Sequence, residues 1–413
     1  MVCGFLDGMT THGETTTEPL PGLPTDRPNP FDPPAALRPI RDRGPLHRMT
    51  YTDGRPGWLV TGYAEARTVL DDPRFSNSFH ADFSPPIEEL AVAKAPETVL
   101  PPGFFLAMDD PEHARFRKLL IGQFTTRRMQ ALEPHIIEIV EARLDEMART
   151  GSPADLVTAF ARPIPSMVIC ELLGVPYADR DRFQEDADTM VDLERTAGER
   201  AGAVQSVMGY LAELVGRKRA EPADDMLGGL VAGGALNDAE LAGVATFLLV
   251  AGHDTTANML GLGTFLLLQN PDQAALLRQD PALADQAVEE MLRYLTIAHI
   301  GPIRVATEDV PMSGQTIRAG ETVTISLPVA HRDPDRFADP DRLDLTRHSR
   351  GHLAFGHGIH QCLGQQLARV ELRVAYPALL RRFPGLRLTV PPEQVPLRTR
   401  GTLYGVDRLP VAW

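Results

Sequence analysis

The sequence predicts a mainly α-helical protein, a helical bundle with one long central helix and small peripheral β-sheets. A helix-compatible apolar pattern runs from Asn237 to Asn270, about 34 residues, whereas an ordinary helix has roughly 11 or 12. Most of the remaining chain also shows helical periodicity. Runs of strand-forming residues are short and lie mostly in the second half of the chain, which predicts small sheets at the periphery.

Length, composition and charge narrow the class of protein. The 413 residues fit one large domain or two ordinary ones, and a content of 43% hydrophobic and 23% charged residues is typical of a globular protein with a sizeable core. The net charge of -14 argues against a nucleic-acid-binding protein, which normally has a basic balance. We therefore expect no nucleic-acid partner.

Cysteine usage and hydropathy indicate the compartment. Cys3, Cys170 and Cys362 are too few and too scattered for a disulfide framework or a multi-cysteine zinc site, which points to a reducing environment. Residues 1–21 lack the apolar core of a signal peptide, and no uninterrupted run of about 18 apolar residues occurs. We expect a cytoplasmic protein without a membrane anchor.

The first hundred residues combine irregular segments with one hairpin. Residues 1 to about 35 are rich in proline and polar residues, so we expect them to wrap over the surface or to be poorly ordered. A turn at Asp53-Gly54 precedes a strand at Trp58–Thr61, and a short helix follows at Tyr63–Leu70. Residues 74–102 show no sustained period, and their length predicts a functional loop or a lid.

Helices dominate the next part of the chain. Asp109-Asp110-Pro111-Glu112 places acidic residues and a proline where a helix begins. Further helices are predicted at Arg128–Arg149, Leu156–Leu173, Ala178–Val191 and Ala197–Lys218. The glycine- and alanine-rich stretches between them are predicted to be turns.

The long central helix has a clear start and an unusual middle. Asn237, followed three residues later by Glu240, is the capping-box arrangement. Apolar residues surround the helix, so it must be buried along most of its length, which is on the order of 50 Å. Its middle, Ala251-Gly-His-Asp-Thr-Thr256, contains residues of low helix propensity and two threonines that can bond to carbonyl groups one turn back. We expect the helix to be weakened at its most buried point.

The second half contains a helix at Leu283–Leu295, in which Glu290 and Arg293 share one face within ion-pair reach. Strands are predicted at Pro302–Ala306, Thr322–Leu327, Leu386–Val390 and Thr402–Gly405.

Cys362 lies between a glycine-rich loop and the first turn of an amphipathic helix. Gly356 and Gly358 allow tight turns, and Gly364 permits close packing just inside the helix. Because a helix N-terminus carries free N–H groups and a positive dipole end, we expect Cys362 to favour the thiolate. The residue types alone leave three uses open: a buried structural thiol, a catalytic nucleophile or a metal ligand.

The pattern Phe355-Gly-His-Gly-Ile-His-Gln-Cys362-Leu-Gly364 resembles the haem-ligand loop of the cytochrome P-450 family. Residues 251–256 resemble the oxygen-activating helix of that family, Glu290-Met-Leu-Arg293 resembles its Glu-x-x-Arg pair, and Arg332-Asp-Pro334 with Phe337 resembles the segment that locks this pair. Order and spacing agree over residues 55–413. The resemblance implies the cytochrome P-450 fold, with the long helix over the haem, in a single domain spanning residues 1–413.

The resemblance also implies roles for individual residues. Cys362 is the expected axial ligand of haem b (iron protoporphyrin IX), and a thiolate ligand favours cleavage of the O–O bond of bound dioxygen. Phe355, which is expected to pack beside the sulfur, and Gly364 are expected to take part in binding the haem. Asp254 and Thr255 are expected to relay protons, and Glu290 with Arg293 to form a buried structural pair. The positions that match propionate-binding residues of the family are His113, Arg117, Arg304 and His360.

The function that follows is that of a haem-thiolate monooxygenase that hydroxylates or epoxidises a bulky, mostly apolar small molecule. The sections 294–298 and 403–413 resemble soluble actinobacterial members that act on polyketides, macrolides and foreign compounds. The expected substrate contacts are Phe83, Phe104, Leu106, Leu248, Leu249, Ala251, Ile297, Ile300 and Leu403. Two other functions stay open: a haem protein that binds a ligand without oxygenating it, and a haem-free enzyme with a cysteine nucleophile.

Electrons must come from a separate protein. The chain has neither a Gly-x-Gly-x-x-Gly fingerprint after a strand nor a cysteine cluster for iron–sulfur, so we expect a ferredoxin with its ferredoxin reductase, acting on a monomer. A basic face on the cysteine side of the haem would steer an acidic partner. Its expected members are Arg115, Lys118, Arg127, Arg128, His357 and Arg369.

Overall fold

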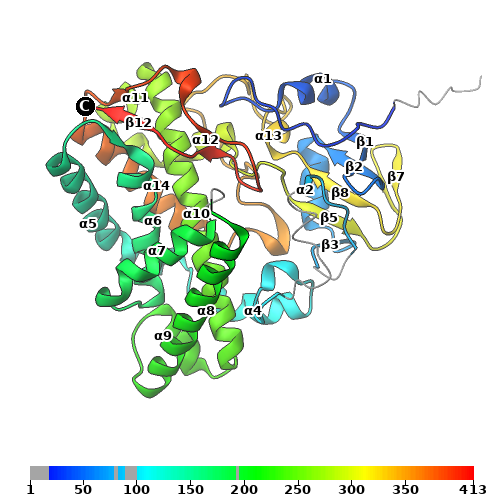
Figure 1. Ribbon diagram of the computed structural model, residues 1–413. Helices are drawn as coiled ribbons and strands as arrows, with labels where there is room; N and C mark the ends of the chain where they lie inside the picture. The colour runs from blue at the N-terminus through cyan, green and yellow to red at the C-terminus, as the bar shows by residue number, and fades with distance from the viewer. Residues whose placement is uncertain (1–17, 79–81, 89–99, 192–194) are drawn as a thin grey trace, which may run out of the picture.

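The computed structural model describes residues 18–413 except 79–81, 89–99 and 192–194. Parts of two predicted segments, residues 1–35 and the loop 74–102, therefore lie outside the described residues. A large helical part occupies one side of the molecule, and a smaller part built on a β-sheet occupies the other (Figure 1). The predicted mainly α class with small sheets is confirmed. None of the described helices is both long and apolar enough to cross a membrane.

The helical part is built around α10 (Asp238–Gln269), which packs against α6, α8 and α14. Apolar side chains of these helices form the main core, in which Leu260 and Phe265 are fully buried. The predicted capping box is present, because Asn237 Oδ1 accepts from the Glu240 N–H and Glu240 Oε2 accepts from the Asn237 N–H, each at 2.9 Å. The other helices of this part are α4 (Glu112–Ile121), α5 (Thr126–Thr150), α6 (Pro163–Leu173), α7 (Arg180–Val191), α8 (Ala197–Ala220), α9 (Met226–Gly233), α11 (Pro271–Gln279), α12 (Ala284–Leu295) and α14 (Gln365–Arg382).

The main sheet has five strands in the order β1-β2-β8-β5-β3. The predicted hairpin forms its β1–β2 edge, with Leu46 opposite Val60, and β2 then pairs in parallel with β8, with Trp58 opposite Val323. A second apolar core fills this part between the sheet and α2 (Tyr63–Asp71). The strands are β1 (Leu46–Thr50), β2 (Pro56–Val60), β3 (Phe75–Ser76), β5 (Ile303–Ala306) and β8 (Thr322–Ile325).

Three smaller sheets complete the described structure. The sheet β4-β12-β9 joins the end of the chain to the residues just before Val157, β6-β7 is a hairpin, and β10-β11 lies against α10. Their strands are β4 (Ala154–Asp155), β6 (Val310–Met312), β7 (Gln315–Ile317), β9 (Arg387–Leu388), β10 (Leu397–Arg398), β11 (Gly405–Val406) and β12 (Pro410–Ala412). The predicted strand at Thr402–Gly405 is wrong in extent, because Leu403 forms only an isolated bridge with Ala298 before β11 begins.

The predicted weak segment of α10 is not the most buried part of the helix. The helix is continuous through 251–256, and its most buried stretch begins at the last residue of this segment and runs from Thr256 to Leu267. Ala251, Asp254 and Thr255 are only half-buried. Packing along the rest of the helix outweighs the low propensity of a few residues. The expected side-chain bond is present, because the Thr255 hydroxyl donates to the Ala251 carbonyl at 2.6 Å.

One helix was not predicted, and one predicted boundary differs. The glycine-rich stretch Met226–Gly233 forms α9, because Asp225 caps it by accepting from the Gly228 N–H and its apolar residues are buried in the core. The single helix predicted at Leu156–Leu173 is divided into a π-helical turn, Val157–Ala161, and α6. Pro163 at the start of α6 lacks an N–H, so the helical hydrogen-bond pattern must restart there.

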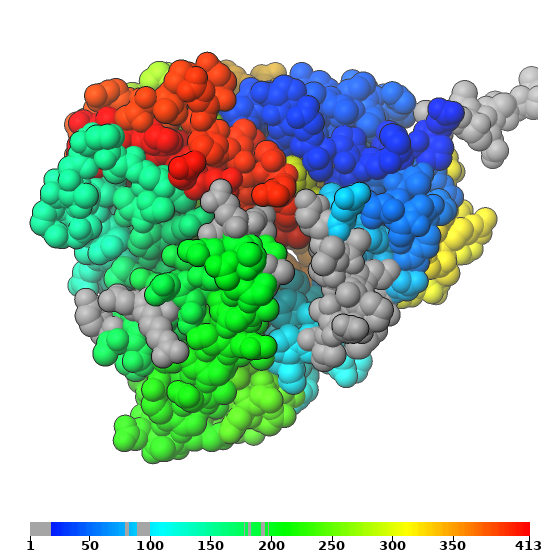
Figure 2. All heavy atoms as spheres, in the orientation of Figure 1, coloured from blue at the N-terminus to red at the C-terminus, as the bar shows by residue number. Residues whose placement is uncertain are grey.

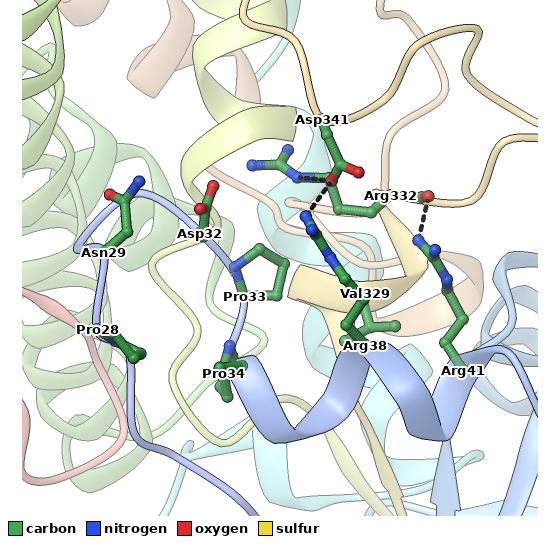
Figure 3. Close-up of a pocket in the computed structure, with 11 residues that line it drawn as sticks. Pro28, Asn29, Asp32, Pro33, Pro34, Arg38, Arg41, Val329, Arg332 and Asp341 are labelled. Atoms are coloured by element: carbon green, nitrogen blue, oxygen red, sulfur yellow. Dashed lines mark hydrogen bonds and ion pairs between the residues drawn. The ribbon is translucent and has the colours of Figure 1, made fainter.

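The described N-terminal segment lies over both parts of the molecule. The Phe31 ring contacts the Phe265 ring of α10 edge to face, with 4.8 Å between centroids. From α1 (Arg38–Arg41), Arg38 pairs with Asp341 at 3.3 Å, and Arg41 Nη1 donates to the Arg332 carbonyl at 2.8 Å (Figure 3). Arg38, Arg41 and Asp341 line a pocket of about 190 Å³ that includes none of the predicted haem or substrate residues. The short helix α13 (Leu327–Ala330), which follows β8, contacts both α2 and α12.

Candidate active site

The Cys362 loop is shaped by two glycines and ends at α14. Gly356 and Gly358 have φ of +70° and +71°, as the predicted tight turns require. The Cys362 N–H donates to the Phe355 carbonyl at 2.7 Å, which closes the loop. Gly364 is the N-cap of α14, and a Cβ there would meet no described protein atom within 4 Å. What Gly364 provides is a backbone N–H directed at the Cys362 sulfur.

The predicted preference of Cys362 for the thiolate is wrong for the protein alone. Burial among protein atoms raises the pKa of the Cys362 thiol, although the N–H groups of Gly364 and Gln365 and the nearby Arg117 act in the opposite direction. The side chain nevertheless keeps exposed surface, so a ligand can reach the sulfur. A metal ion at the sulfur would supply the positive charge that a desolvated thiolate needs.

Glu289, which the sequence did not single out, holds the base of the loop. Its carboxylate accepts from Arg369 Nε at 2.5 Å and lies 3.3 Å from His352 Nε2. Arg369 in turn covers the Phe355 ring at 4.5 Å. Burial acts to raise the pKa of Glu289, but the hydrogen bonds from His352 and Arg369 outweigh it and lower the pKa to about 2. Glu289 thus fixes Phe355 through a charged pair.

The four predicted propionate-binding residues come together although they lie far apart in the sequence. The His113 ring on α4 and the His360 ring of the cysteine loop have centroids 4.2 Å apart. Arg304 on β5 is buried, and burial lowers its pKa to about 10. Burial, together with the neighbouring His113, Arg304 and Arg117, lowers the pKa of His360 to about 3. The cluster therefore disfavours further positive charge and favours an anion.

The chemistry of this cluster fits the two carboxylates of haem. Among the described residues, both ring nitrogens of His360 and Nε2 of His113 are buried without a hydrogen-bond partner. Arg304 donates through Nη1 to Asn77 Oδ1 at 2.7 Å and to its neighbour's carbonyl, and forms no ion pair with a described carboxylate. Unsatisfied buried donors need acceptors, and propionate oxygens are the strongest that haem offers.

On α10, Asp254 and Thr255 lie in the half-buried segment. Asp254 Oδ1 accepts from Asn258 Nδ2 at 2.9 Å and from Arg398 Nη1 at 2.8 Å. Neither partner was predicted. Asn258 follows Asp254 by one helical turn, so helical spacing could have identified it. Arg398 is 144 residues away, and no local pattern connects it to Asp254. His253 on the same segment is buried, with Nε2 2.9 Å from Asp188 Oδ1 of α7.

The pair Glu290–Arg293 is fully buried, as predicted. Arg293 Nε and Nη2 each donate to a different oxygen of Glu290 at 2.8 Å. The Arg293 guanidinium also donates to the carbonyl of His331 at 2.9 Å and lies over the Phe337 ring at 5.3 Å. His331 itself accepts from the Leu353 N–H at 2.8 Å, so the residue after α13 connects this pair to the start of the cysteine loop.

The predicted substrate contacts divide by exposure. Leu248, Leu249 and Ile300 are buried in this structure, which places their side chains in the protein core. The residues that keep exposed surface are Phe83, Phe104, Leu106, Ala251, Ile297 and Leu403. The Phe104 ring packs edge to face on the ring of Phe247 of α10, with 4.9 Å between centroids. Phe247 was not among the predicted substrate contacts. Figure 2 shows a hollow near the centre of the visible face, between the green surface of the 200–230 region and the cyan and red segments.

The cysteine loop facing an anion-binding cluster, in a helical protein with a long central helix, defines the class of a haem-thiolate protein. A family model described as cytochrome P450 matches residues 224–406. Cytochrome P450 105C1 of a Streptomyces species is 51% identical over 390 residues, which cover 94% of this chain and 97% of that protein. Vitamin D3 dihydroxylase of Streptomyces griseolus is 45% identical, covering 97% of this chain and 100% of that protein.

The fold agrees with this relationship. The crystal structure of CYP105P1 in complex with filipin I has a TM-score of 0.88 at 45% identity, covering 95% of this chain and 99% of that one. The chain belongs to the cytochrome P450 family. It is a monooxygenase, an oxidoreductase that uses haem and dioxygen. Membership sets aside both alternatives, the non-oxygenating haem protein and the haem-free cysteine enzyme.

Proposed function

We propose that this monooxygenase hydroxylates or epoxidises a bulky, mostly apolar secondary metabolite or foreign compound, with electrons from a ferredoxin and its reductase. The proposed substrate class is supported by half-buried apolar side chains on separate segments of the chain. They include Phe104, Phe247, Ile297 and Leu403. Apolar surface with few polar groups selects large apolar ligands. Filipin I and vitamin D3, which appear in the names of the relatives described above, are of this kind.

We propose that Cys362 holds the haem iron and that His113, Arg117, Arg304 and His360 hold its propionates. Haem bound in this way supplies the activation of dioxygen. The buried, unpaired nitrogens of His113 and His360 support the propionate assignment, because carboxylate oxygens would satisfy them.

We propose that Asp254 and Thr255 deliver protons on the opposite side of the haem. Both side chains are half-buried, so they combine a fixed position with contact to solvent. The Thr255 hydroxyl already donates to the Ala251 carbonyl, and its oxygen lone pairs remain free to accept a proton or a water. A carboxylate and a hydroxyl on adjacent residues can pass a proton between them through water.

The proposed electron donor docks on the side of Cys362. Two of the predicted basic residues are not free cations, because Arg115 pairs with Glu240 at 2.6 Å and Arg369 with Glu289 at 2.5 Å. Lys118 and Arg127 are exposed. Ile359, three residues before Cys362, is 44% exposed and would add an apolar contact with the electron donor. We propose that the acidic electron donor contacts Lys118, Arg127, Arg128 and Ile359.

A spin-state titration tests the substrate class. Purified holoprotein is titrated with filipin I and vitamin D3, and with a small polar compound such as glycerol as the control. We expect the two apolar compounds, and not glycerol, to shift the Soret band toward the high-spin position. Turnover with NADPH and a surrogate ferredoxin system should then yield an oxygenated product. Absence of a shift with every apolar compound tried would contradict the proposed substrate class.

A further inference from the structure

The carboxylate of Asp254 is held on one oxygen only. Arg398 Nη1 and Asn258 Nδ2 both donate to Oδ1, at 2.8 Å and 2.9 Å. Within the part of the chain that the structure describes, Oδ2 receives no hydrogen bond. The side chains of Asp254 and Arg398 are each only 13% exposed, so this ion pair is shielded from bulk water and weakly screened.

The position of Arg398 follows from packing between α10 and the β10–β11 hairpin. Asp254, Asn258 and Gly261 lie at helical spacing on one face of α10. A Cβ on Gly405 of β11 would come within 2.1 Å of Asn258 Oδ1, and a Cβ on Gly261 within 2.9 Å of Val406 Cγ2, so the strand lies directly on that face. Arg398 is the cross-strand partner of Gly405 and reaches past it to Asp254.

The ion pair is specific. Asp254 is the only described carboxylate that pairs with Arg398, and Arg398 Nε is buried without a partner. Loss of Asp254 would therefore leave a largely buried cation, and loss of Arg398 would leave Asn258 as the one donor to Oδ1. Asn258 is on the same helix and also donates to the Asp254 backbone carbonyl at 2.8 Å. It cannot by itself prevent rotation of the carboxylate about its side-chain bonds.

We propose that Arg398 is a positioning residue for proton delivery. By holding Oδ1 it fixes the carboxylate and leaves Oδ2 as the oxygen that takes up a proton from water and gives it up again, so that the carboxylate is regenerated. This inference rests on the proposed relay function of Asp254. A rotating carboxylate would present either oxygen in variable positions, and proton transfer requires hydrogen-bond distance in a fixed geometry.

Infrared spectra of the ferrous-CO holoprotein test the positioning directly, because the C–O stretching band responds to nearby polar groups. The variants are Arg398→Gln, Arg398→Lys, Asp254→Asn and, as the matched control, Arg400→Gln, an exposed residue two positions further along. We expect a broadened or split band for Arg398→Gln, partial recovery for Arg398→Lys and the wild-type band for Arg400→Gln. The fraction of NADPH electrons recovered as hydrogen peroxide, with filipin I as the probe, should rise severalfold in Arg398→Gln.

The outcomes separate the inference from the function on which it rests. If Asp254→Asn alters the band and the peroxide fraction while Arg398→Gln changes neither, the inference is overturned and the relay role of Asp254 stands. If Asp254→Asn itself behaves as the wild type, the relay role fails and the inference fails with it. Should Arg398→Gln not bind haem, Arg398→Met keeps the apolar stem packed on α10 and answers the same question.

Discussion

Replacing Glu290 by glutamine should destabilise the protein far more than the same change at an exposed Glu–Arg pair. Five hydrogen bonds end on the two oxygens of Glu290, from two Arg293 nitrogens, Arg347 Nε, the Ser349 hydroxyl and the Asp344 N–H. Every partner is a donor, so the NH₂ group of a glutamine would face donors and two guanidinium groups would lose their counter-charge.

The expected magnitude follows from burial. Removing one partner of a buried pair costs about 3–5 kcal/mol, a large share of a total stability of roughly 5–15 kcal/mol. Glu146 and Arg149 on α5 have the same three-residue spacing, but their side chains are 40% and 72% exposed. An exposed pair of this kind contributes little to stability, because water screens it. Glu146→Gln is therefore a control for spacing and residue type.

Urea unfolding, followed by loss of the thiolate-type ferrous-CO spectrum and by circular dichroism, measures the difference. Glu290→Gln should lower the unfolding midpoint strongly and reduce the yield of haem-loaded protein, while Glu146→Gln should leave both close to the wild type. If the two variants lost similar stability, burial would not be what makes the pair Glu290–Arg293 important, and the argument from the donor arrangement would be refuted.

Three further predictions concern the site. Cys362→Ser should lose the thiolate-type spectrum and all turnover, and a variant that keeps both would disprove the ligand assignment. Thr255→Ala should bind haem and filipin I normally but divert electrons to hydrogen peroxide; an unchanged peroxide fraction would exclude the hydroxyl from the relay. Because the pKa of Glu289 is lowered from 4.5 to about 2, its pair with Arg369 and His352 should contribute roughly 3 kcal/mol above about pH 4.5, lost as the pH falls toward 2. Glu289→Gln should flatten the dependence of unfolding free energy on pH in that window, and an unchanged slope would contradict this.

Patterns of a few neighbouring residues were sufficient to predict the structural features that depend only on the nearby backbone. The capping box at Asn237 and Glu240, the positive φ at Gly356 and Gly358, and the three-residue spacing of Glu290 and Arg293 each involve residues less than two turns apart. Their sequence signals follow from backbone geometry alone. For the same reason the α10 start and the turns of the cysteine loop were predicted correctly.

Contacts between distant segments were not predictable in this way. Arg398 reaches Asp254 only because β11 packs on one face of α10, and this packing depends on the register of the β10–β11 hairpin. The pKa of Cys362 was misjudged because the dipole of α14 is a local property, whereas the burial that outweighs it comes from the whole fold. α9 was missed because glycine lowers helix propensity, but tertiary burial of its leucines compensates.

Adjacent polar residues on α12 and on α10 contact different segments around the site. On α12, Glu289 binds Arg369 and His352 beside the cysteine loop, while Glu290 binds Arg293 and Arg347. Successive residues on a helix point about 100° apart, so one helix can hold two segments at once. On α10, His253 and Asp254 contact α7 and β10 in the same way. These contacts thus join α12 to the cysteine loop, and α10 to α7 and β10.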